Sequence, residues 1–78
     1  MYSYPKEHFI SFDNEPDYLG RITIVKTSKG LNSEIDIVFS ESMKIYRHVH
    51  SYFNYDDEKD LLDESVQFLA NFVRRSNP

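Results

Sequence analysis

The sequence contains no cysteine, no tryptophan and only two glycines among its 78 residues. The absence of cysteine excludes a disulfide framework, a thiolate zinc site and a cysteine nucleophile. Because Gly20 and Gly30 stand alone, a glycine-rich phosphate-binding loop is excluded as well. No stretch reaches the roughly 18 consecutive apolar residues of a membrane span. The fold must therefore be held by ordinary side-chain packing, alone or with help from dimerisation or a partner.

Basic residues are also few: nine Lys and Arg stand against thirteen Asp and Glu, which gives a formal net charge of -4. Contact with nucleic-acid phosphates or an anionic membrane needs clustered Lys and Arg, so both partners are disfavoured. Residues 1–7 lack the basic and apolar regions of a signal peptide, and we expect a cytoplasmic protein. No His-Glu-x-x-His helix or other catalytic motif is present, so the sequence predicts no enzyme, no cofactor and no metal site.

The chain is short enough that its core must be thin. We expect one domain, residues 1–78, that buries only about 60–65% of the surface exposed by the unfolded chain. Hydrophobic residues make up 40% of the sequence, and six Phe and six Tyr supply much of the area available for burial. That content is adequate for a small packed domain.

Three segments have the alternation of half-buried strands: Glu7–Asp13, Tyr18–Thr27 and Glu34–Ser40. A turn at residues 14–17 and a polar loop at residues 27–33 separate them. Residues 57–75 are predicted to form a helix, because their apolar residues recur with helical spacing. Acidic residues at the start of this segment and arginines at its end match the helix dipole.

Residues 42–55 support two interpretations. Their aromatic and β-branched side chains favour a strand. However, Ile45, Val49 and Tyr52 recur at helical spacing, with Arg47 and His48 on the opposite helical face. We favour a helix, with a strand as the alternative.

The predicted fold class is α+β: a small antiparallel sheet of three strands followed by two C-terminal helices packed on one face. The alternative has four strands and one helix. The other face of the sheet would present the moderately apolar Leu19, Val25 and Val38. In both arrangements the predicted core consists of Ile22, Ile24, Ile35, Ile37, Phe39, Leu62, Val66, Leu69 and Val73.

An acidic run and several tyrosines are the candidate partner-binding features. Residues 56–64 hold six carboxylates and one lysine, more acid than a helix dipole uses in its first turn. The excess indicates a surface that attracts a basic partner, and tyrosine is enriched where interfaces bind most strongly. Helix capping and packing across the sheet are the structural interpretations of the same residues. The predicted partner-binding residues are Tyr2, Tyr4, Tyr55, Asp56, Asp57, Glu58 and Asp60.

Two histidines separated by one residue are the one hint of a metal. On a strand, His48 and His50 would share a face and could bind an ion together with His8 or a carboxylate. On a helix they would diverge by about 200°. Since no third ligand is identifiable, we predict a solvated His48 and a His50 beside the core.

The outline of a small sheet, then helices, in an acidic chain without cysteine resembles that of small phage-encoded inhibitors, including some anti-CRISPR proteins. The ending Arg74-Arg75-Ser76-Asn77-Pro78 is similar to that of one such family. The resemblance includes no internal motif and implies no site residue. We expect a non-catalytic protein-binding module, an inhibitor, immunity or adaptor protein, that occupies the surface of another protein with a basic surface. The alternatives are a self-associating homodimer and a nucleic-acid- or metal-responsive regulator that uses His48 and His50.

Overall fold

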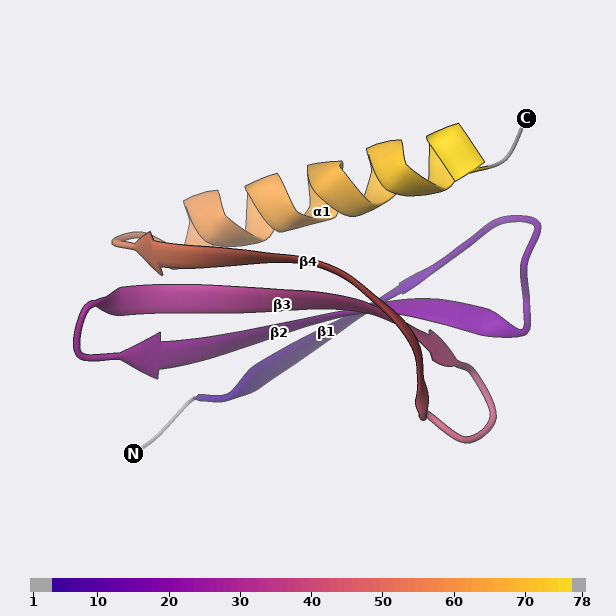
Figure 1. Ribbon diagram of the computed structural model, residues 1–78, viewed down its shortest axis with the longest axis horizontal. Coiled ribbons are helices and arrows are strands. Elements are labelled where there is room, and N and C mark those ends of the chain that lie inside the picture. Colours follow the sequence, from indigo (N-terminus) through magenta and orange to yellow (C-terminus); the bar gives the residue numbers. More distant parts are fainter. Residues whose placement is uncertain (1–3, 77–78) are drawn as a thin grey trace.

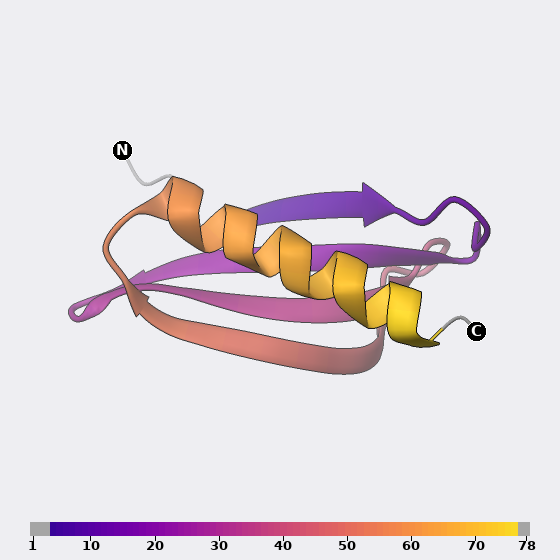
Figure 2. The same cartoon turned by 90° about the horizontal axis from the view of Figure 1, so that it is seen from above.

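Residues 4–76, the part of the chain that the computed structural model describes, form four strands and one helix. The helix α1 (Glu58–Ser76) lies diagonally across one face of the sheet, here called the covered face; the other is the open face (Figure 1, Figure 2). The α+β class is confirmed, with the four-strand, one-helix alternative in place of the favoured three strands and two helices. The strands pair antiparallel in chain order: β1 (Lys6–Ser11), β2 (Tyr18–Thr27), β3 (Gly30–Phe39) and β4 (Ile45–Tyr55).

The predicted helix over residues 42–55 is wrong, because this segment contains strand β4. Pairing between β3 and β4 shifts register at three points, and each shift places one extra residue in β4. Such bulges interrupt the alternation of a strand. As a result Ile45, His48 and Ser51 all reach the open face at intervals of three residues, a spacing that imitates a helix.

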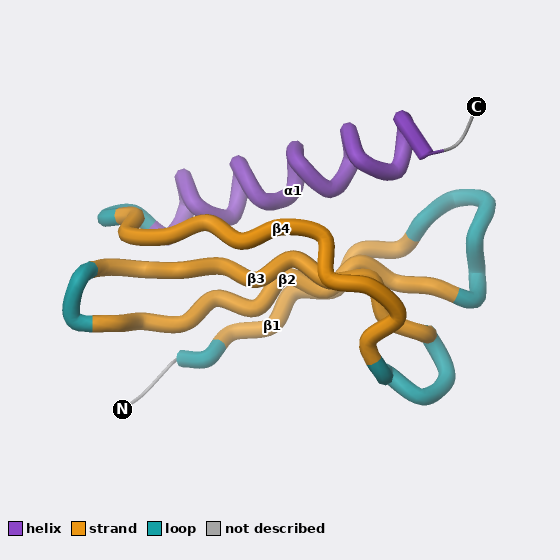
Figure 3. Tube along the Cα trace, in the orientation of Figure 1, coloured by secondary structure: helices purple, strands orange, loops and turns teal. Residues whose placement is uncertain are grey.

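The connection between β2 and β3 is tighter than predicted. Thr27 pairs with Gly30, so only Ser28 and Lys29 form the turn, and β3 begins at Gly30 instead of Glu34 (Figure 3). Gly30 has a φ of 139°, a conformation that side-chain-bearing residues rarely adopt. A Cβ at this position would also lie 2.8 Å from the carbonyl oxygen of Tyr55. The turn therefore requires glycine.

The core fills the space between α1 and the covered face. Of the predicted core residues, Ile22, Ile24, Ile35 and Leu69 are confirmed as buried, and Leu31 and Leu61 join them. Ile37, Leu62 and Val73 are half-buried and pack against this cluster. The prediction is wrong for Phe39 and Val66, which are both 38% exposed, because Phe39 ends its strand and Val66 lies at the margin of the helix contact.

Gly20 allows the close approach of α1 to β2. A Cβ on Gly20 would clash with Cδ2 of the buried Leu69, so the absence of a side chain there makes room for the helix. Within residues 4–76 no helix combines the length and the apolar character needed to cross a membrane.

Candidate functional site

Two of the predicted partner-binding residues, Tyr4 and Glu58, connect the start of the chain to the start of α1. The hydroxyl of Tyr4 donates to Glu58 Oε1 at 2.5 Å, and Lys6 Nζ lies 2.9 Å from both carboxylate oxygens of Glu58. The Lys6 ammonium also sits 5.1 Å from the centre of the Tyr4 ring. Hydrogen bonds from Tyr4 and Lys6 hold the pKa of Glu58 below its ordinary value. Tyr4 and Glu58 thus have partners inside the protein, whereas Tyr2 lies outside the described residues.

The remaining predicted residues surround an open hollow where β4 leads into α1. We call it the acidic hollow; its volume is about 360 Å³. Tyr55 is half-buried and packs edge-on against Tyr52, with ring centres 5.8 Å apart. The structure therefore brings Tyr55 together with three of the predicted acids and adds two that were not predicted. The lining consists of Tyr55, Asp56, Asp57, Asp60, Asp63, Glu64 and Gln67.

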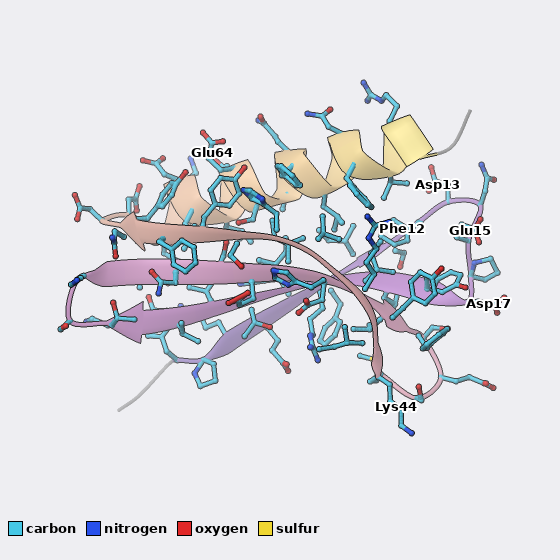
Figure 4. The ribbon with its side chains drawn as sticks, in the orientation of Figure 1. Phe12, Asp13, Glu15, Asp17, Lys44 and Glu64 are labelled. Atoms are coloured by element: carbon cyan, nitrogen blue, oxygen red, sulfur yellow. The ribbon has the colours of Figure 1, made fainter. Side chains whose placement is uncertain are left out.

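The carboxylates of the acidic hollow are exposed. Asp57 precedes the first residue of α1 and accepts a hydrogen bond from the backbone N–H of Lys59 at 3.3 Å, so it caps the helix. Glu64 projects from α1 away from the sheet (Figure 4). Among the side chains that the structure describes, the ion pairs include none of the hollow's carboxylates. Their charge is therefore directed to solvent.

A second polar cluster, on the open face, was not predicted. Asp36, whose side chain is only 7% exposed, lies 3.4 Å from Arg21 Nη2 and 2.8 Å from His48 Nδ1. His48 Nε2 lies 3.0 Å from the Ser51 hydroxyl, which donates to Glu34 at 2.6 Å. These residues come from β2, β3 and β4, and the bulges of β4 determine which of its residues join them. Because the sequence favoured a helix over residues 42–55, it gave no indication that these side chains would lie together.

The order Asp36, His48, Ser51 is that of a nucleophilic triad, but the hydrogen bonds run the wrong way for one. Ser51 has a single proton, which it donates to Glu34. That proton is therefore not directed to His48 Nε2, whereas activation of a serine requires the imidazole to accept the serine proton. This chain of hydrogen bonds instead joins β3 to β4 and satisfies the buried carboxylate of Asp36.

The two histidines that hinted at a metal lie on opposite faces of the sheet. His50 stacks on Phe68 of α1, with ring centres 4.2 Å apart and planes at 11°, while His48 pairs with Asp36 on the open face. The bulge between these residues separates them, because without it their side chains would share a face. Within the described part of the chain, no group of three or more His, Asp or Glu side chains is placed to hold a metal ion.

No family model, curated protein or solved structure matches this chain.

Proposed function

We propose that this protein is a non-catalytic protein-binding module of the inhibitor, immunity or adaptor type, which occupies a basic surface on a partner protein. The observation that supports this best is the acidic hollow, whose carboxylates are exposed and point to solvent. Carboxylates at positions 56, 57, 60, 63 and 64 share it, with Lys59 as the one cation in that stretch. A concentrated charge of one sign attracts an oppositely charged partner and accelerates association.

Helix stability alone does not account for these acids. Asp57 caps α1 and Asp60 lies in its first turn, where the helix dipole favours negative charge. Asp63 and Glu64 lie beyond that turn, where the benefit from the dipole has largely fallen away. Placing them beside Asp60 adds repulsion between like charges. Recognition of a basic partner gives this arrangement a role that the fold does not.

The alternatives have less support. Self-association could use an exposed edge strand, but short edge strands and bulges discourage pairing with another chain. The edge strand β1 has only six residues, and the edge strand β4 is interrupted by three bulges. A nucleic-acid-responsive regulator would use Arg47, yet that guanidinium lies 5.1 Å from the centre of the Phe72 ring of its own chain.

The test compares two variants that change net charge equally. Asp63→Asn/Glu64→Gln removes two carboxylates from the acidic hollow that have no capping role, and Glu7→Gln/Glu41→Gln removes two exposed carboxylates elsewhere. A partner captured from host cells is immobilised, and association rates are measured from low to high salt. We expect the first variant to associate about three- to ten-fold more slowly at low salt, with the difference shrinking as salt is added.

The control variant should associate within about two-fold of the wild type. Equal slowing by both variants would show that only overall charge matters, and no slowing by either would remove the acidic hollow from the interface.

A further inference from the structure

A second hollow lies at the opposite end of α1 from the acidic hollow, between the β1–β2 turn, the start of β4 and the end of the helix (Figure 4). We call it the aromatic hollow; its volume is about 190 Å³. Of its seven lining side chains, four are aromatic, two are aliphatic and one is a carboxylate. The lining residues are Phe12, Tyr18, Tyr46, Phe72, Ile37, Val73 and Glu15.

The rings at the mouth of the aromatic hollow hold one another in place. Tyr18 and Tyr46 have centres 5.0 Å apart, and Phe39 lies 5.5 Å from Tyr18 and 5.3 Å from Tyr46. Tyr46 is nevertheless 55% exposed, because a β4 bulge sets it outside the regular pairing. Rings that are already ordered lose little conformational entropy when they bind a ligand.

The β1–β2 turn beside the aromatic hollow is acidic, whereas Arg47 places one positive charge against the Phe72 ring. Glu15 forms part of its wall, and Asp13 and Asp17 belong to the same turn (Figure 4). Backbone hydrogen bonds from Glu15 to Phe12 and from Tyr18 to Glu15 fix this turn. None of the three carboxylates takes part in an ion pair between described side chains. A cation entering the hollow would therefore meet both aromatic faces and an available carboxylate.

The protein already holds one guanidinium against a ring of this hollow. The Arg47 guanidinium carbon lies 5.1 Å from the centre of the Phe72 ring, within the range of a cation–π contact. Arginine suits such a site better than lysine. Its planar and weakly hydrated group stacks on aromatic rings and pairs with a carboxylate through two donors.

We propose that the aromatic hollow binds an arginine side chain of the partner protein, with Tyr18 and Tyr46 contacting the guanidinium and Glu15 accepting its hydrogen bonds. The inference rests on the proposed function in that a basic partner supplies the arginine. The molecule would then meet this partner at two separated points, the acidic hollow and the aromatic hollow.

The test needs no partner. The full-length protein is titrated with acetyl-Gly-Arg-Gly-amide and, separately, with the same peptide carrying citrulline, which keeps the shape of arginine and loses its charge. Ring resonances of Tyr18, Tyr46 and Phe72 are followed by NMR. We expect saturable shifts with the arginine peptide and about ten-fold weaker binding of the citrulline peptide.

Variants locate the site. Tyr46→Leu should weaken binding of the arginine peptide about ten-fold and Tyr46→Phe should retain it, because the ring face remains. Phe53→Leu is the matched control, since Phe53 is an exposed aromatic residue of the same strand and lies outside the hollow. Glu15→Gln should also weaken binding.

Equal affinity for the two peptides, or the absence of saturable shifts in the ring resonances of Tyr18, Tyr46 and Phe72, would overturn the proposal. Such a result would leave the salt-dependent association through the acidic hollow intact, so the two proposals fail separately.

Discussion

The two faces of the sheet use alternate residues of the same strands for opposite purposes. On the covered face Ile22, Ile24 and Ile35 are fully buried under α1, and a pair of serines is the polar contact in their midst. On the open face the buried Asp36 carboxylate lies 3.4 Å from Arg21 Nη2 and 2.8 Å from His48 Nδ1. The covered face therefore stabilises the fold by removing apolar area from water, whereas the open face buries Val38 and in addition pairs polar and charged side chains with one another.

This difference identifies which charges are available to a partner. The open-face acids Glu34 and Asp36 are hydrogen-bonded within the sheet, to Ser51 and to Arg21 and His48. The acids of the acidic hollow lie on α1 and in the two residues before it, and they form no ion pair among the described side chains. Charge alone, counted along the sequence, does not separate the two groups.

The largest effect should come from opening the covered face. Leu69 is 1% exposed, so Leu69→Ala should lower the free energy of unfolding by about 2–5 kcal/mol through lost burial and a residual cavity. Ile45→Ala on the open face, where Ile45 is 55% exposed, should change it by less than about 0.5 kcal/mol. Urea unfolding followed by circular dichroism measures both. Similar losses for the two variants would mean that both faces contribute to the core.

The fold was predictable where the alternation of a strand or the periodicity of a helix is undisturbed. The bounds of β2 were predicted as observed, and those of α1 to within one residue at each end. Prediction failed at β4, because bulges are set by pairing with β3 and are not visible in the spacing of one segment.

The sites were predictable only where they are local in sequence. The acidic hollow follows from residues 55–64, which are contiguous, and its predicted members there are brought together. The hydrogen bond from Tyr4 to Glu58 joins residues 54 positions apart, and the aromatic hollow takes residues from the β1–β2 turn, from β2, β3 and β4, and from α1. Such contacts depend on the tertiary arrangement, which no local pattern specifies.

A smaller and asymmetric effect is expected from the serine pair of the covered face. Ser33 and Ser65 are both fully buried, with their oxygens 2.8 Å apart, and Ser65 donates to the carbonyl of Leu61. Ser33 must therefore donate to Ser65. Ser65→Ala should cost about 1–3 kcal/mol of unfolding free energy because it leaves the Ser33 hydroxyl without a partner. Ser33→Ala should cost less, since Ser65 keeps its bond to Leu61.

Urea titrations of both single variants and of the double alanine variant measure this asymmetry. The double variant should be no less stable than Ser65→Ala, because it removes the unpaired hydroxyl. Additive losses, or equal losses for the two single variants, would contradict the assigned direction of the hydrogen bond.

The smallest effect concerns the polar rim of the covered face, where Glu58 meets Tyr4 and Lys6. Because the folded state lowers the pKa of Glu58, its stabilising contribution is present above the ordinary glutamate pKa of about 4.3 and is lost as pH falls through the folded-state value. The hydrogen bond to Glu58 raises the pKa of Lys6, so the contribution of Lys6 is present below its ordinary pKa and is lost only in strong alkali.

The unfolding midpoint of the wild type should therefore fall more between pH 6 and pH ~3 than that of Glu58→Gln. The control is Glu41→Gln, which alters an exposed acid without an ion pair among the described side chains and should keep the acid sensitivity of the wild type. Because the Lys6 and Glu58 side chains are 34% and 30% exposed, added salt should weaken the difference, and a difference unaffected by salt would mean that another group is responsible.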